Sequence, residues 1–284
     1  MLQLVPNSPI GAGTSPVALT TDPLGKFLFA ANLQSNNVSA YSIDQATGEL
    51  KAVAGSPFVA GKGPMSLAVD VSGNYLYVAN STDDNISGYS IDSTDGRLIP
   101  LAGFPVAARS NPTAVMTGTN GYVYVVNSGS DSLSLFQVNA ATGALTAIGS
   151  GVSTAHEPSS VAEYAPGNFI YVTNRASNSI SGFTRTAAGN LTELNGSPFP
   201  LYATTPSCSG DQPLRFAAEP QLPFAFVSFA QRLGTCSEVP IEAYQIDLPS
   251  GTLRNAASSP ASGNVFSDHN PLWEWTLQSG SFMW

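Results

Sequence analysis

The segment PMSLAVDVSGNYLYVANSTDDNISGYSID at residues 64–92 decides the fold, because it recurs along the chain at a regular spacing. The related segments each begin at a proline, namely Pro16, Pro112, Pro158, Pro213 and, in a shortened form, Pro271. Self-similarity at a period near 50 residues is the signature of a repeat architecture. The sequence therefore predicts an array of similar modules.

Each module reads as four short strands. After Pro64 an alternation of apolar residues predicts an inner strand, and the aromatic and β-branched run LYVAN at 76–80 predicts a second. The asparagine that closes this run is expected to bond nearby backbone as the chain turns. Ile86 opens a third strand, and Gly96, two residues before Leu98, predicts a tight turn into a fourth. Four antiparallel strands in about 50 residues are typical of a β-propeller blade.

The expected architecture is an all-β propeller forming a single domain over residues 1–284. Five complete blades begin at the prolines numbered 16, 64, 112, 158 and 213. Residues 1–12 match the outer strand of a split or truncated blade, and residues 271–284 match a partial repeat. Two alternatives are open: a truncated seven-bladed ring, or a six-bladed ring with one incomplete blade. We expect the first, with the chain a fragment of a larger propeller.

Composition narrows the classes of function. Only 10% of residues are charged and the net charge is −9, which argues against a nucleic-acid partner because the phosphate backbone attracts basic surfaces. No apolar run approaches the roughly 20 residues of a membrane-spanning helix. The first residues do not resemble a signal peptide. The sequence has no phosphate-binding loop and no Cys/His cluster, so we expect neither a metal nor a cofactor.

Three motifs together resemble the seven-bladed lactonase-like propellers. They are IYVTN at 170–174, the hairpin pattern Ile-Asp-x-x-x-Gly-x-Leu at 91–98, and Gly-Ser-Pro-Phe at 55–58, which we interpret as the end of the fourth strand. That family includes 6-phosphogluconolactonase-like proteins and overlaps with the YVTN-repeat propellers, and the resemblance covers essentially the whole chain. It implies lactonase or lactonizing activity, with His, Glu and Arg at the mouth of the ring and no bound metal.

One position of the repeat gathers the residues with useful chemistry. The residue two before each opening proline should lie around the mouth of the central channel, and these are Thr14, Lys62, Ser110, His156, Asp211 and His269. Both histidines of the chain fall there. Lactone hydrolysis needs a base and a cation or donor for the developing oxyanion. We predict catalytic roles for His156, Glu157 and His269, and ligand binding by Lys62, Arg109, Asp211 and Arg215.

The function predicted from these residues is hydrolysis of a small anionic lactone, such as a sugar lactone. A histidine in such a loop more often belongs to a solvated turn. The stretch TAHEPSS at 154–160 also lacks the Pro-His-x-His pattern of enzymatic relatives. The alternative is a non-catalytic exported propeller that binds a protein or a glycan, which the net charge of −9 favours. Glu163, on an inner strand, fits a structural ion pair as well as a ligand contact.

The two cysteines predict the compartment. Cys208 precedes the fifth blade and Cys236 follows its second strand, so both belong to connections on the same face of one blade. We predict a disulfide between them, which would indicate a periplasmic or extracellular protein. Free thiols would indicate the cytoplasm instead.

Overall fold

The structure is a computed structural model, which describes residues 4–201, 212–230 and 241–255. These residues form five antiparallel sheets and contain no α-helix. Three single 3-10 turns are present, η1 (Thr119–Gly121), η2 (Ser128–Ser130) and η3 (Ala165–Gly167).

Each sheet is one blade, and the blades follow one another in chain order. Blade 1 contains β1 (Pro16–Thr21), β2 (Phe27–Asn32), β3 (Asn37–Ile43), β4 (Leu50–Ala52) and β5 (Phe58–Val59). Blade 2 contains β6 (Pro64–Val69), β7 (Tyr75–Asn80), β8 (Asn85–Ile91), β9 (Leu98–Pro100) and β10 (Val106–Ala107). Blade 3 contains β11 (Pro112–Thr117), β12 (Tyr122–Asn127), β13 (Ser132–Val138), β14 (Leu145–Ala147) and β15 (Val152–Ser153). Blade 4 contains β16 (Pro158–Tyr164), β17 (Phe169–Asn174), β18 (Ser179–Arg185), β19 (Leu191–Glu193) and β20 (Phe199–Pro200). Blade 5 contains β21 (Gln212–Ala218), β22 (Phe224–Ala230), β23 (Ile241–Ile246) and β24 (Leu253–Asn255).

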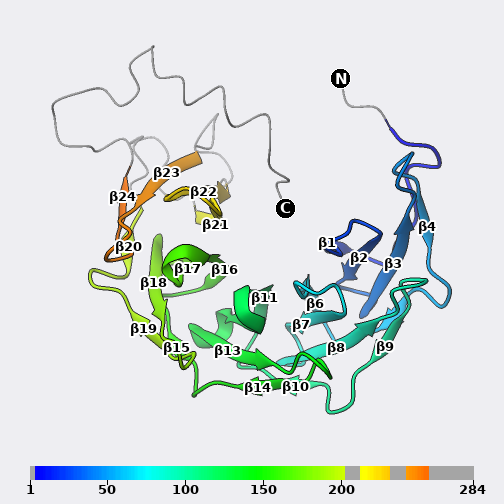
Figure 1. The fold of residues 1–284 in the computed structure, drawn as a ribbon, viewed down its shortest axis with the longest axis horizontal. Coiled ribbons are helices and arrows are strands. Elements are labelled where there is room, and N and C mark those ends of the chain that lie inside the picture. The colour runs from blue at the N-terminus through cyan, green and yellow to red at the C-terminus, as the bar shows by residue number, and fades with distance from the viewer. Residues whose placement is uncertain (1–3, 202–211, 231–240, 256–284) are drawn as a thin grey trace.

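The blades are arranged in an arc, with β1, β6, β11, β16 and β21 on its inner side (Figure 1). Four blades begin at the predicted prolines and the fifth begins at Gln212, one residue earlier than predicted. This confirms the all-β propeller architecture. Residues 4–15, which include most of the expected outer strand at 1–12, form turns and no strand. The expected partial repeat at 271–284 lies outside the described residues.

The outermost strand differs from the prediction in blades 1 to 4, because it is broken into two short pieces. In blade 1 both β4 and β5 pair with β3. Between them the chain turns at Gly55, which has φ +86°, a conformation that glycine adopts without steric cost. Ser56 Oγ then accepts the main-chain N–H of Ala40 at 2.9 Å. The Gly-Ser-Pro-Phe motif is therefore a bend inside the outer strand and not its end.

The core lies between adjacent blades and is built from both faces of the second strands. Tyr77 and Tyr171 are fully buried, and their hydroxyls donate to the main-chain oxygens of Gly143 and Gly251 in the following blade, at 2.8 and 2.7 Å. Burial raises the pKa of Tyr77 far above its ordinary value, because the phenolate would lose its hydration. Each tyrosine thus fills the space between two blades and also bonds them together.

Candidate functional site

The turns between second and third strands lie at the same end of the blades as the loops that lead into the inner strands. Main-chain hydrogen bonds join the two in each of the first four blades: Leu33 N–H to Ser15 O, Ser81 to Gly63, Ser128 to Asn111, and Arg175 to Glu157, at 2.7–2.9 Å. We call this end of the blades the mouth end. It is the face on which the sequence placed its candidate residues.

The asparagines that close the second strands form the base of the mouth end. Asn80 is fully buried, and its side-chain amide donates to Ser87 Oγ at 2.9 Å and to Asn85 Oδ1 at 2.8 Å. The same bond to a serine seven residues later recurs as Asn32–Ser39, Asn127–Ser134 and Asn174–Ser181. In blades 3 and 4 the asparagine also donates to nearby main-chain oxygens, as expected: Asn127 to Val125 O at 3.2 Å and Asn174 to Ser179 O at 3.3 Å. The serine bond is added to these because the turn brings the third strand directly beside the second.

A second repeated contact joins blade 1 to blade 2, blade 2 to blade 3, and blade 3 to blade 4. The residue four positions after the closing asparagine has a left-handed backbone, with φ 53° at Asp84 and 46° at Asp131. Asp84 Oδ1 accepts the main-chain N–H of Asn111 at 2.7 Å, and Asp131 Oδ1 accepts that of Glu157 at 2.9 Å. Asn36 bonds Gly63 in the same way at 2.9 Å. We call this contact the blade-junction hydrogen bond.

At the junction of blades 3 and 4, the same aspartate also holds a histidine. Asp131 Oδ2 lies 2.8 Å from His156 Nδ1, and the main-chain N–H of His156 donates to Ser177 Oγ at 2.8 Å. The His156 side chain is 79% exposed. In a neutral imidazole, a carboxylate beside Nδ1 selects the tautomer that carries its proton there, so that Nε2 is the acceptor on the exposed side chain. The pair therefore has the arrangement of a base held by a carboxylate.

Glu157 lies beside this pair in an unusual backbone conformation. Its φ is 52°, and its side chain is exposed at the mouth end. Left-handed backbone is uncommon for residues other than glycine, asparagine and aspartate, and it stores strain that often marks a functional position. The conformation belongs to the repeat, because Ser15, Gly63 and Asn111 hold the same position in blades 1 to 3 with φ of 59°, 68° and 52°. Of these, Gly63 and Asn111 suit it better than a glutamate.

Arg175 is a residue of this site that the sequence analysis missed. It directly follows the closing Asn174, and its Nη2 donates to Gln212 Oε1 of blade 5 at 2.9 Å. Its Nε is buried and has no hydrogen-bond partner among the described residues. The sequence could have shown it, because the residue after the closing asparagine is uncharged in blades 1 to 3 and an arginine in blade 4. The residues of blades 1 to 3 are Leu33, Ser81 and Ser128.

Among the described residues, three further predicted ones lie away from this junction. Lys62 is exposed at the junction of blades 1 and 2, where its main-chain N–H donates to Asp83 Oδ2 at 2.8 Å. The Arg109 side chain donates to the main-chain oxygen of Ser150 in the outer part of blade 3. Arg215 is exposed on β21. The described residues do not include Asp211, His269, Cys208 or Cys236. The predicted disulfide, and the compartment inferred from it, therefore stay predictions.

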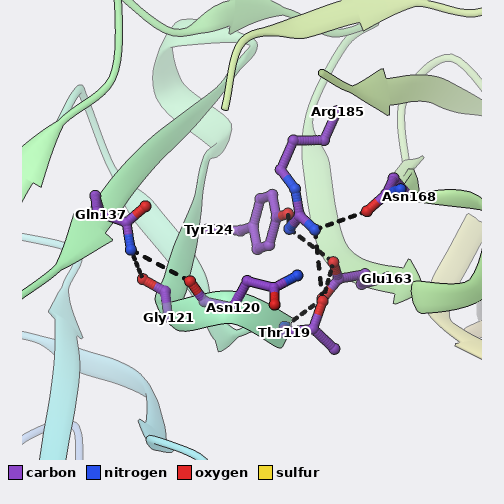
Figure 2. Close-up of polar contacts among 8 residues, drawn as sticks. All are labelled: Thr119, Asn120, Gly121, Tyr124, Gln137, Glu163, Asn168 and Arg185. Atoms are coloured by element: carbon purple, nitrogen blue, oxygen red, sulfur yellow. Dashed lines mark hydrogen bonds and ion pairs between the residues drawn. The ribbon is translucent and has the colours of Figure 1, made fainter. Parts of the chain in front are cut away.

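Glu163 belongs to a buried network at the opposite end of blades 3 and 4 (Figure 2). Arg185 Nη1 lies 2.7 Å from Glu163 Oε1, and the two side chains are only 3% and 5% exposed. Arg185 also donates to the Tyr124 hydroxyl at 2.6 Å and to Asn168 Oδ1 at 2.9 Å. The main-chain N–H of Thr119 donates to Glu163 Oε2 at 2.6 Å. The ion pair lies within blade 4, and its bonds to Thr119 and Tyr124 link this blade to blade 3. The network is separate from the mouth end.

Comparison with known proteins identifies the family. The model for the family described as lactonase, 7-bladed beta-propeller, matches residues 4–116 and 105–209. The chain belongs to this lactonase propeller family. No curated protein sequence matches it. Among the described residues of this lactonase-family propeller, no helix is long and apolar enough to span a membrane, and no three side chains are grouped to hold a metal.

Solved structures share the fold at low sequence identity. A 6-phosphogluconolactonase candidate from Bacteroides uniformis has a TM-score of 0.71 and 19% identity, over 87% of this chain and 72% of that one. A second, from Bacteroides fragilis, has a TM-score of 0.67 and 18% identity, over 86% and 69%. The periplasmic gluconolactonase PpgL of Pseudomonas aeruginosa has a TM-score of 0.65 and 18% identity, over 87% and 72%. Likeness at these identities shows the fold, and the activity has to be argued from the site.

Proposed function

We propose that this lactonase-family propeller hydrolyses a small sugar-like lactone at the junction of blades 3 and 4. The observation that carries the proposal is the 2.8 Å contact between Asp131 and His156, which holds the imidazole while leaving Nε2 open to solvent. The family match and the similarity to structures described as lactonases support the same reaction class.

In the proposed reaction, His156 is the general base for a water molecule. The water oxygen bonds to the lactone carbonyl carbon while Nε2 takes one of its protons. The ring C–O bond then breaks, and the imidazolium returns the proton to the departing ring oxygen. The product is a hydroxy acid, which loses its acidic proton to solvent. Asp131 supports both steps, because its carboxylate fixes the ring orientation and stabilises the imidazolium.

Glu157 has a separate part in this proposal. Its exposed carboxylate makes no hydrogen bond within the described residues, so it is free to accept hydrogen bonds from substrate hydroxyl groups. Sugar lactones carry several such hydroxyls. The main chain of Glu157 is already anchored on both sides, by its N–H to Asp131 and by its oxygen to Arg175, which fixes where the carboxylate can reach.

The test is turnover of glucono-δ-lactone and of its 6-phosphate, followed by proton release in a pH-stat against the rate without protein. We expect His156→Ala and Asp131→Asn to lower kcat by about a hundredfold or more, the contribution of a general base. Asp84→Asn is the matched control, because it weakens the same blade-junction hydrogen bond where the neighbouring residue is Ser110 and not a histidine. Absence of turnover by the unmodified protein would refute the proposal and favour the non-catalytic protein- or glycan-binding alternative.

We also propose that the protein functions in the periplasm or outside the cell, on the basis of the disulfide that the sequence predicts between Cys208 and Cys236. Thiol titration of the denatured, unreduced protein, after expression in an oxidising compartment, decides this point. Two free thiols would overturn it.

A further inference from the structure

Two Asn-Gly pairs occur in the chain, Asn120-Gly121 and Asn195-Gly196. In such a pair the main-chain nitrogen of the glycine can attack the side-chain amide carbon of the asparagine, because glycine has no Cβ to hinder the approach. The peptide that joins the two residues has to rotate toward the asparagine side chain before the bond can form. The structure around each pair therefore sets how fast it reacts.

Asn195 lies at the bend between β19 and β20, where the joining peptide is unrestrained. Ser197 N–H donates to Leu194 O at 3.1 Å and closes a β-turn, and the φ of +84° at Gly196 makes this a type II turn. Asn195 and Gly196 are exposed. Within the part of the chain that the structure describes, neither the Asn195 main-chain oxygen nor the Gly196 N–H has a hydrogen-bond partner. Type I and type II turns differ by rotation of this same peptide, which can therefore turn without breaking a hydrogen bond.

Asn120 has the same following residue but a restrained peptide. The Gln137 side-chain amide donates to both main-chain oxygens of this pair, to Asn120 O at 3.3 Å and to Gly121 O at 2.9 Å (Figure 2). Rotation of the joining peptide would break the first of these hydrogen bonds. The structure thus protects one Asn-Gly pair and leaves the other free to react.

The fold does not require an amide at position 195. Blades 1 and 2 make the corresponding bend with Ala54 and Ala102, each followed by a glycine with φ of +86° and +84°. Among the described residues, the Asn195 side chain has no hydrogen-bond partner. A change in its chemistry therefore removes no contact from the blade.

We propose that Asn195 is a site of covalent modification, at which asparagine converts to aspartate and isoaspartate. The Gly196 nitrogen forms a bond to Asn195 Cγ and loses its proton, and the side-chain nitrogen leaves as ammonia. Water then opens the five-membered imide. Opening at the side-chain carbonyl gives aspartate, and opening at the main-chain carbonyl gives isoaspartate, in which the main chain runs through the former side chain. The proposal does not depend on lactone hydrolysis.

Isoaspartate lengthens the main chain at a bend that is anchored on both sides. Leu194 N–H donates to Gly182 O at 2.9 Å, and Gly182 N–H donates to Ser197 Oγ at 3.0 Å. An extra main-chain carbon between Leu194 and Ser197 distorts one or both of these hydrogen bonds. The modification also adds a negative charge to a chain whose net charge is already −9. It should therefore loosen the outer edge of blade 4.

The experiment is incubation of the folded protein at mildly alkaline pH, followed by proteolysis and mass spectrometry. Conversion raises the mass of a peptide by about 1 Da, and a methyltransferase specific for isoaspartate reports that product by transfer of a labelled methyl group. We expect Asn195 to convert at least about fivefold faster than Asn120, the factor expected from one neutral hydrogen bond to Gln137. Protein unfolded in urea should convert both asparagines at similar rates, because these contacts are then absent.

Asn195→Ala is the matched variant, because it gives this bend the Ala-Gly sequence of blades 1 and 2. It should retain the stability of the fresh protein and lose most of the isoaspartate labelling. After incubation, the unmodified chain should unfold at a lower urea concentration than Asn195→Ala, and equal midpoints would refute the loosening of blade 4. Gln137→Ala should speed conversion at Asn120. Equal rates at the two asparagines in the folded protein, or labelling undiminished in Asn195→Ala, would overturn the proposal.

Discussion

Replacing Arg185 with methionine tests the buried link between blades 3 and 4. The variant leaves the Glu163 carboxylate in place, 95% covered, with hydrogen bonds from Thr119 but without its cation. Removing one partner of a buried ion pair typically costs about 3–5 kcal/mol. The Arg185 guanidinium also lies 4.2 Å from the centre of the Tyr122 ring, so its loss removes a cation–π contact as well. We therefore expect a loss of at least about 3 kcal/mol in the free energy of unfolding.

The assay is urea denaturation followed by circular dichroism. The double variant Glu163→Leu/Arg185→Met should be less destabilised than Arg185→Met alone, because it leaves no uncompensated charge. Arg97→Met is the exposed control: its pair with Asp92 is 3.9 Å long, with side chains 53% and 30% exposed, and should contribute less than about 1 kcal/mol. A loss below about 1 kcal/mol in Arg185→Met, or a double variant less stable than the single one, would refute the reasoning.

Three further outcomes are expected. Gly88→Ala places a Cβ 2.5 Å from the Phe104 ring and should lower the free energy of unfolding by about 1–3 kcal/mol in urea denaturation. Adding Phe104→Leu to this variant should restore part of the loss. An unchanged stability of Gly88→Ala would show that the ring moves away without cost. Asn80→Ala leaves the Ser87 hydroxyl without its buried donor and should cost about 1–3 kcal/mol, so a neutral result would contradict the role of the closing asparagines. Burial raises the pKa of Glu242 above its ordinary value of 4.5, so the folded state binds this proton more tightly and loses stability as the pH rises past 4.5. Between about pH 4 and pH 7, the unfolding free energy of Glu242→Gln should fall less than that of the unmodified protein, as measured by urea denaturation at each pH. Identical pH profiles of the two proteins would contradict this prediction.

The blade pattern could be predicted because it depends on local chemistry. A turn that needs a positive φ selects glycine, and Gly48 and Gly96, with φ of 74° and 79°, recur at the same offset from the third strand. The two-part outer strand was missed because the Gly-Ser-Pro-Phe bend was interpreted as an end. Sequence position alone cannot show that the chain continues along the same edge of β3 after the bend.

The site was predicted only in part, because it depends on contacts between repeats. His156 and Glu157 stood out through their residue type and position before Pro158. Asp131 lies 25 residues before His156, in the previous blade, and its role follows only from the way adjacent blades meet. Arg175 was passed over because it follows a motif that reads as scaffold.

The blade-junction hydrogen bond has a consequence for how such proteins gain and lose chemistry. At the junction of blades 2 and 3, Asp84 already holds Asn111 as Asp131 holds Glu157, and the neighbouring residue is Ser110 where the later junction has His156. Each duplication of a repeat therefore copies an anchoring carboxylate or amide before any reactive group exists beside it. Replacement of one residue in the loop before an inner strand, such as Ser110 or His156, can then supply or remove an imidazole. The strands of the blades are unchanged by that replacement.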